Sequence, residues 1–458
     1  MAPRVLVDRF GSFFDSTDGQ KGTYARSDSG ESLDVEDQQR RRRSKRRIKH
    51  DPKVTLPLLV LIDMFAVSLV VPLLFQYYKQ AGITSANQRE LLSSLFSTAQ
   101  IVGGLLMGVV TDARLVSRHT ILRLSFGGSA LSYLLIVYGG LHSLLFSRVL
   151  VGLVKQTMTV TTTMLSKCTN KENRAKYMGR LSAASTVAWI VGPSAGAMLY
   201  HYWDHRAPAL LASALFVLNL ILSTILLPED PEEETKEHSR KLGTSVMSNL
   251  RSCFSSKTLG SIVATKLIFT WVTKATSFSQ LGSFYEDMYG LDPHHRGYIS
   301  SYQQLLQFLV QATLVGPIMA HTGGERQAVS VFTALIPAVV FVQSSRSLWL
   351  FLLVLCPLCS LSHATVGLSL QSLVTHEAPQ TSLFSVLAAL DVLQNFVSVS
   401  VPFYRTFLFR FLDQGEGDMA GDPDPVEWML ASAVHWLVAA LAIGALLLWT
   451  GRETKLLK

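Results

Sequence analysis

The segment LVLIDMFAVSLVVP, Leu59 to Pro72, places one aspartate inside an otherwise apolar run. The run is part of a longer apolar stretch, 54–78, which as a helix is long enough to cross the roughly 30 Å hydrocarbon core of a bilayer. Asp63 lies roughly 15 Å from the start of that helix at about 1.5 Å per residue. Its short side chain reaches neither surface, so it needs a partner or a polar cavity inside the protein.

Apolar stretches of similar length recur along the chain. Hydrophobic residues make up 48% of the chain and charged residues only 16%, and the mean hydropathy of +0.29 excludes an ordinary soluble protein. About twelve stretches are long enough to span a membrane, and all are expected to be helical because an open sheet leaves its backbone unsatisfied in lipid. The expected spans are 54–78, 89–112, 119–140, 142–166, 177–201, 207–228, 257–285, 297–320, 326–345, 347–374, 382–411 and 427–450.

The polar segment PEDPEEETKEHSRKLG, Pro228 to Gly243, divides the spans six and six. An even division around a charged loop suggests two homologous half-bundles with a binding site between them. The sequence therefore predicts an all-α membrane protein built from two pseudo-symmetric six-helix bundles. In order, we expect a disordered basic tail, an N-terminal bundle, a cytoplasmic linker loop, a C-terminal bundle and a short tail: 1–53, 54–228, 229–256, 257–451 and 452–458.

Basic residues predict the orientation in the membrane. The run RRRRSKRRIK, Arg40 to Lys49, directly precedes the first span, a position that indicates contact with anionic lipid on the cytoplasmic side rather than with nucleic acid. The loops after spans two, four and six are also basic, whereas the segment Asp413 to Glu427 on the opposite side is acidic. Both termini are therefore predicted to be cytoplasmic, in the plasma membrane or an endomembrane.

The loop GVVTDARLVSRHT, Gly108 to Thr120, resembles the signature loop of the major facilitator superfamily. Gly108, Asp112 and Arg118 match its pattern. Ser117 replaces the second glycine of the pattern, and the loop is longer. The resemblance implies that the matching residues form a cytoplasmic gate latch.

Two further motifs carry the same resemblance. Span four contains SRVLVGL, in which Arg148 and Gly152 match the Arg-x-x-x-Gly pattern of the family. Span five contains AWIVGPSAGAM, in which Gly192, Pro193 and Gly196 are in register with the Gly-Pro-x-x-Gly motif of the antiporter branch. Over residues 54–450 the chain thus resembles the tetracycline and drug:proton antiporter branch.

That resemblance implies a central cavity lined by helices one, four, seven and ten. It also implies alternating access by rocking of the two halves. The motif glycines and proline of span five would let that span pack and bend against the other half.

Ionisable residues inside the spans should face a cavity or each other, because a charge at mid-bilayer is costly. Asp63 and Lys155 are expected at matched depths of roughly 15 Å, as are Lys266 and Asp391. We therefore predict two ion pairs, Asp63 with Lys155 or Arg148 in one half, and Lys266 with Asp391 in the other.

Polar stripes indicate a wet cavity. The stripes are Lys266, Thr270, Lys274, Ser277 and Gln280 in span seven, Gln304, Gln307 and Gln311 in span eight, and Asp391, Asn395 and Ser398 in span eleven. Hydrogen bonds between helices are an alternative reading of the glutamine stripe. The interior cations outnumber the interior acids, which favours an anionic or electron-rich substrate.

A proton-coupled carrier needs a titratable group. Asp63, Asp391 and His363 are the candidates, although His363 also fits a hydrogen-bonded packing role between helices.

Several functions are excluded by missing motifs. The sequence has no Gly-Lys-Ser/Thr phosphate loop, no nucleophile elbow and no metalloprotease helix, so we expect neither ATP-driven transport nor an enzyme. No cofactor or metal is predicted, and His294 and His295 are interpreted as ordinary loop residues. We expect a monomeric, proton-coupled secondary transporter of a small organic solute. A non-transporting receptor, chaperone or scaffold of the same fold is the alternative.

Overall fold

The computed structural model describes residues 51–83, 86–112, 116–169, 171–227, 251, 253–277, 284–292, 294–379, 383–412 and 424–456, and these residues form helices and turns without a strand. The predicted basic tail up to residue 50, most of the linker loop and the last two residues lie outside the described residues.

Helices of the N-terminal half run in chain order from the first span to the sixth. They are α3 (Pro52–Val70), the 3-10 turn η1 (Val71–Leu73), α4 (Leu74–Gln80), α5 (Ala86–Asp112), α6 (Arg118–Tyr138), α7 (Leu141–Val154), α8 (Thr157–Cys168), α9 (Lys171–Tyr202) and α10 (Ala207–Leu226).

Helices of the C-terminal half cover the remaining spans. They are α12 (Lys257–Ala275), α13 (Phe284–Tyr289), α14 (His295–Leu309), η5 (Val310–Leu314), α15 (Val315–His321), α16 (Glu325–Val342), η6 (Gln343–Ser345), α17 (Leu348–Leu350), η7 (Phe351–Leu355), α18 (Cys356–Glu377), α19 (Leu383–Leu412) and α20 (Pro425–Leu456). The segments η5 and η7 are π-helical.

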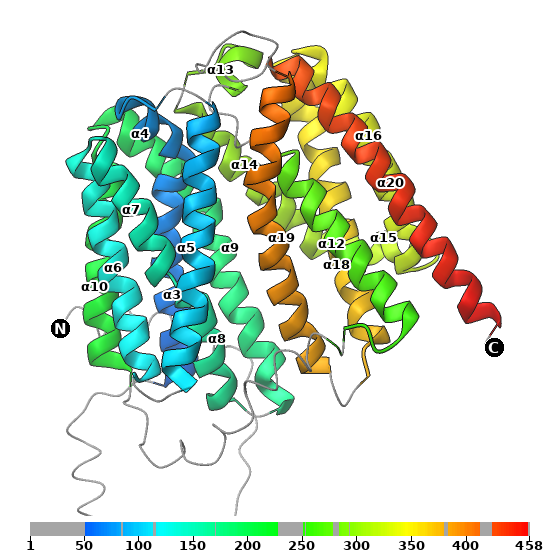
Figure 1. Ribbon diagram of the computed structural model, residues 1–458, viewed down its shortest axis with the longest axis horizontal. Helices are drawn as coiled ribbons and strands as arrows, with labels where there is room; N and C mark the ends of the chain where they lie inside the picture. The colour runs from blue at the N-terminus through cyan, green and yellow to red at the C-terminus, as the bar shows by residue number, and fades with distance from the viewer. Residues whose placement is uncertain are drawn as a thin grey trace, which may run out of the picture.

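The helices form two groups that lie side by side (Figure 1). The groups meet mainly where α14 packs on α9 and where α19 packs on α5. The start of α3 and the end of α20 lie at the lower end of Figure 1, which we call the terminal end; α4 and α13 lie at the opposite, distal end.

Each half has its own hydrophobic core. The N-terminal core draws only on residues between 56 and 227, around Phe126 and Phe216. The main C-terminal core draws only on residues between 253 and 447, around Trp428 and Trp436. Because neither core borrows residues from the other half, each half is held together independently of the contact between them.

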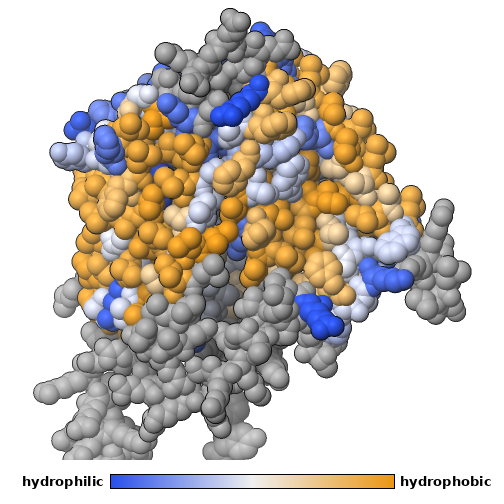
Figure 2. Space-filling view, in the orientation of Figure 1, coloured by the Kyte–Doolittle hydropathy of each residue, from blue (hydrophilic) through white to orange (hydrophobic). Residues whose placement is uncertain are grey.

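Six helical segments within the described residues are long and apolar enough to cross a membrane. They include the segments Pro52–Gln80, Arg118–Tyr138 and Ala207–Leu226 of the N-terminal half. The halves meet through α5 and α9 of the N-terminal half and α14 and α19 of the C-terminal half. Figure 2 shows the corresponding apolar band across the molecule, with a paler strip between the halves.

Two expected spans need correction. Span 142–166 is broken, because Lys155 (φ −74°, ψ 82°) ends α7 and α8 begins only at Thr157. Span 257–285 is helical as α12 only to Ala275, so Ser277 lies beyond the helix, and Gln280 lies outside the described residues. Hydropathy indicated that these stretches could be helical but carries no signal for where the backbone leaves the helix.

Glycines allow close packing inside the N-terminal half. A Cβ on Gly196 would lie 2.1 Å from the Leu69 carbonyl oxygen of α3, and one on Gly192 would lie 1.8 Å from Ser68 Oγ. These two glycines therefore pack against α3 of their own half, which corrects the expectation that they face the other half. Only Pro193 of the motif does so, since its carbonyl oxygen lies against Gly297 of α14.

Replacing Gly196 by alanine is expected to destabilise the protein by about 1–3 kcal/mol, because the new methyl group overlaps the α3 backbone. The matched control is Gly179→Ala on the same helix, where a Cβ meets nothing within 4 Å. Thermal unfolding in detergent compares the two variants. Equal melting temperatures would contradict the packing role.

Candidate functional site

A cavity of about 500 Å³ lies between the two halves. Its walls come from α3, η1, α4, α5, α6, α7 and α9 of the N-terminal half, from Lys155 at the α7–α8 break, and from α13 and α14 of the C-terminal half. Its aromatic lining residues are Phe75, Tyr78, Phe96, Tyr133, Trp189 and Tyr285. Its charged lining residues are Arg89, Glu90, Arg148, Lys155 and Arg296.

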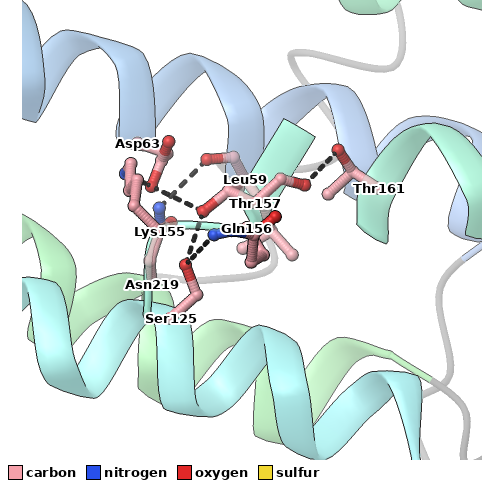
Figure 3. A network of polar contacts seen from close by, with 8 residues as sticks. All are labelled: Leu59, Asp63, Ser125, Lys155, Gln156, Thr157, Thr161 and Asn219. Atoms are coloured by element: carbon pink, nitrogen blue, oxygen red, sulfur yellow. Dashed lines mark hydrogen bonds and ion pairs between the residues drawn. The ribbon is translucent and has the colours of Figure 1, made fainter. Parts of the chain in front are cut away.

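The ion pair between Asp63 and Lys155 is present, as the depth argument predicted. Lys155 Nζ lies 2.5 Å from Asp63 Oδ1, and the aspartate side chain is fully buried. The ammonium group also lies 4.5 Å from the centre of the Phe216 ring. The pair joins α3 to the break between α7 and α8 (Figure 3).

Hydroxyl groups bond to two of the polar groups around this break (Figure 3). Thr157 Oγ1 donates to Asp63 Oδ1 (3.2 Å), and the backbone N–H of Gln156 donates to Ser125 Oγ (3.2 Å). The cation of Lys155 stands at the negative C-terminal end of α7, and the Asp63 carboxylate lies near the positive N-terminal end of α8. Both placements are electrostatically favourable.

Arg148 is a second cation of the cavity wall rather than the partner of Asp63. Its side chain is 6% exposed, and Nε lies 3.4 Å from Ser147 Oγ. Its buried Nη2 atom makes no hydrogen bond within the described part of the chain. Gly152, one turn further along α7, packs against Phe96 and Ala99 of α5, where a Cβ would lie 2.8 Å from a carbonyl oxygen.

The predicted cations of the C-terminal half lie elsewhere. Lys266 Nζ donates to the Gly367 carbonyl (3.0 Å), and Lys274 Nζ donates to Ser398 Oγ (2.5 Å). Neither residue lines the cavity. The side chain of Asp391 lies outside the described residues, so the second ion pair stays a prediction.

Of the remaining cavity candidates, Gln304 lines the cavity and Gln307 does not. His363 also lies outside its wall. The His363 Nδ1 atom is 2.8 Å from the Cys359 carbonyl, and its ring packs edge-on against Trp436. This arrangement supports the packing interpretation of His363.

The signature-loop residues are only partly described. Gly108 and Asp112 belong to the last turns of α5, but their side chains lie outside the described residues. Arg118 begins α6 and is half-buried. Their gating role therefore stays a prediction. At the equivalent place in the C-terminal half, Arg326 pairs with Glu377 at 3.0 Å.

Sequence reasoning missed the cavity residues Arg89, Glu90 and Arg296 and their neighbour Arg405. The first three stood at or beside the expected ends of spans 89–112 and 297–320, where charge is normal. Arg405 stood inside span 382–411, and this intramembrane cation was the signal that could have found it.

These missed residues bring the two halves together. The Arg405 guanidinium lies 3.2 Å from Glu90 Oε1, with side chains 3% and 5% exposed. Phe75 of α4 lies between two guanidinium groups, 4.6 Å from that of Arg89 and 5.1 Å from that of Arg296 in the other half. The pairs thus link α5 to α19 and α4 to α14.

Further polar contacts between the halves lie at the same, distal end. The Ser194 amide donates to Ser301 Oγ (3.0 Å), and Gln76 Nε2 donates to Glu286 Oε1 (3.1 Å). Together with the Glu90–Arg405 pair, these contacts join the two halves on the distal side of the interface.

Asp63→Asn is expected to lower the free energy of unfolding by about 3–5 kcal/mol, because it leaves the buried Lys155 cation without its counter-ion. Chemical denaturation in detergent measures the change. The control, Asp204→Asn, removes a partly exposed acid beside His205 and should cost less than about 1 kcal/mol. Equal effects of the two changes would refute a buried charge pair.

Comparison with known proteins gives the family. Residues 56–402 match the profile of the Major Facilitator Superfamily. The class H tetracycline resistance protein of Pasteurella multocida is 27% identical over 220 residues, 47% of this chain and 54% of that protein. The chain spans about half the length of the curated relatives that it matches.

Solved structures show the same fold. The nucleoside transporter NupG has a TM-score of 0.67 at 13% identity, covering 87% of this chain and 99% of NupG. The human organic anion transporter MFSD10 (TETRAN) has a TM-score of 0.59 at 18% identity, covering 85% and 98%. These findings confirm the predicted two-bundle fold, and the chain belongs to the Major Facilitator Superfamily of multi-pass membrane proteins.

Proposed function

We propose that this protein is a secondary active transporter that moves a small organic anion by alternating access, coupled to protons. The observation that carries the proposal is the cavity of about 500 Å³ between the two halves, lined by both of them. A volume of this size accommodates a small organic molecule.

The charge of the cavity supports an anionic substrate. Among the described residues, its charged lining is Arg89, Arg148, Lys155 and Arg296 together with one acid, Glu90. Adding the two ion-pair partners, Asp63 and Arg405, leaves the group with an excess of positive charge. Fixed cations in a low-dielectric cavity attract anions. The likeness to a human organic anion transporter supports the same class of substrate.

The aromatic lining narrows the substrate further. Tyr78, Tyr133 and Trp189 lie in the same wall as Arg148. Tyrosine and tryptophan side chains offer apolar ring surface together with an O–H or N–H group. This combination suits an amphipathic anion better than an inorganic one. We therefore expect a carboxylate, sulfate or phosphate group on an organic body.

Alternating access is supported by the division into two cores. Rigid halves with separate cores rock about their interface without unpacking either core. In the arrangement seen, the polar contacts between the halves lie at the distal end. We infer that they form the closed distal gate, and that the proposed cytoplasmic side is the terminal end.

Proton coupling rests on the Asp63–Lys155 pair. Lys155 lines the cavity, and Asp63 lies behind it at 2.5 Å. A proton on Asp63 would remove the counter-ion of Lys155 and leave the ammonium group to bind the substrate anion. Proton binding and anion binding are thereby linked, each changing the affinity of the other by the same factor.

The non-transporting alternative is favoured by one observation. In the signature loop, Ser117 stands where the family pattern has its second glycine, and the loop is longer than that pattern. A receptor or scaffold of this fold would not need a working gate latch.

Flux into proteoliposomes tests transport, with a library of organic anions and cations and with or without a pH gradient. Arg148→Gln is expected to lower anion uptake about tenfold or more, since a hydrogen bond to a charged group is worth about 1.5–3 kcal/mol. Arg206→Gln, an exposed arginine at the start of α10, is the control and should leave uptake unchanged.

The outcomes separate the parts of the proposal. Preferential uptake of cations would overturn the substrate class. Uptake that ignores the pH gradient, or a gradient effect that persists in Asp63→Asn, would overturn the coupling. Absence of flux for every solute would favour the scaffold.

Glu90→Gln is expected to loosen the distal gate, because one partner of a buried charge pair across an interface is worth about 2–5 kcal/mol. The reporter is Ser301→Cys, a buried interface position, in a chain whose four native cysteines are replaced by alanine. Its labelling by a water-soluble maleimide should rise at least about tenfold, as a loss of 1.4 kcal/mol already implies.

The control for this experiment is Glu427→Gln, an exposed acid at the start of α20. Exchange of the pair, Glu90→Arg with Arg405→Glu, should restore slow labelling. Unchanged labelling in Glu90→Gln would show that the pair does not hold the gate.

A further inference from the structure

A cluster of imidazole rings lies at the distal end, apart from the cavity. His294 and His295 stand at the start of α14 in the C-terminal half, and His201 stands in the last turn of α9 in the N-terminal half. The rings of His201 and His294 are stacked, with centroids 4.1 Å apart, and those of His294 and His295 are also 4.1 Å apart. The cluster therefore crosses the contact between the halves.

A carboxylate completes the group. Ligand atoms of Asp292, His294 and His295 all lie within 4.8 Å of one another. Imidazole nitrogens and carboxylate oxygens are ligands that Zn²⁺ accepts at about 2.0–2.2 Å, which places tetrahedral ligand atoms about 3.3 Å apart. Asp292 is exposed and the two histidines are half-buried, so small side-chain rotations can close the remaining distance.

The environment of the two histidines suits metal binding. His295 Nδ1 lies 3.3 Å from the Asp292 carbonyl oxygen, a contact that fixes the tautomer and leaves Nε2 as the ligand atom. A neutral imidazole is the form that coordinates a metal.

We propose that Asp292, His294 and His295 form a binding site for a transition-metal ion of the Zn²⁺ class, with His201 of the other half as the fourth ligand. The proposal departs from the sequence-based interpretation, in which His294 and His295 were ordinary loop residues and no metal was expected.

Such a site would act on the distal gate. It ties the end of α9 to the start of α14, the two helices that also meet through Gly297 and Pro193 and through Ser194 and Ser301. A bound ion stabilises the arrangement in which its ligands lie close together. It does not stabilise the opposite arrangement, in which the ligands are apart. Zinc on the distal side would therefore hold the gate closed.

Isothermal titration of the purified full chain with Zn²⁺ tests the site without any transport measurement, so its outcome is independent of the proposed function. The wild type is expected to bind one Zn²⁺ ion. His294→Ala and His295→Ala should each lose at least about tenfold in affinity, since even an outer-shell partner of a metal site is worth about 10–100-fold. His205→Ala is the matched control, because His205 is a half-exposed histidine beside Asp204, elsewhere in the chain.

The role of His201 as a ligand from the N-terminal half is tested by a separate measurement, the melting temperature. Zn²⁺ should raise the melting temperature of the wild type and of His205→Ala, and His201→Ala should bind Zn²⁺ more weakly and lose most of that rise. Equal zinc affinity in the wild type and in both His294→Ala and His295→Ala would overturn the site. If Zn²⁺ raises the melting temperature of His201→Ala as much as that of the wild type, His201 is not a ligand. Circular dichroism of each variant confirms that it is folded.

Discussion

The buried charge pair of Asp63 and Lys155 is the constraint around which the N-terminal half is arranged. Burying two charges costs several kcal/mol per ion, and their attraction repays it only with good geometry and further hydrogen bonds. Thr157 supplies such a bond to the carboxylate. Lys155 reaches Asp63 from the residue at which α7 ends, and the same residue lines the cavity.

Hydropathy was enough to predict the fold, because bilayer thickness dictates the length of every span. Depth counting also placed Lys155 at the height of Asp63, with Arg148 as the alternative partner, since helical rise converts sequence position directly into height. The break at Lys155 escaped prediction because Val151 and Val154 before it and Met158 and Val160 after it are compatible with one continuous membrane helix. Hydropathy does not report where the backbone leaves the helical conformation, because side-chain hydrogen bonds stabilise such a break.

The candidate site was predicted less completely than the fold. The N-terminal residues Asp63, Arg148 and Lys155 were found, whereas Arg89 and Arg296 were not singled out, because charge is normal at the ends of spans. Whether Arg89 and Arg296 lie close together depends on which helices of the two halves face each other, and a single sequence does not contain that information. Phe75, which lies between their guanidinium groups, looked like any other aromatic residue of a span.

The separate cores also bear on how the chain is made. Every residue of the N-terminal core precedes residue 228, whereas the main C-terminal core begins at Cys253. Chains are synthesised from the N-terminus, and domains generally fold as units in that order. The first half therefore has all the apolar partners it needs before the second half leaves the ribosome.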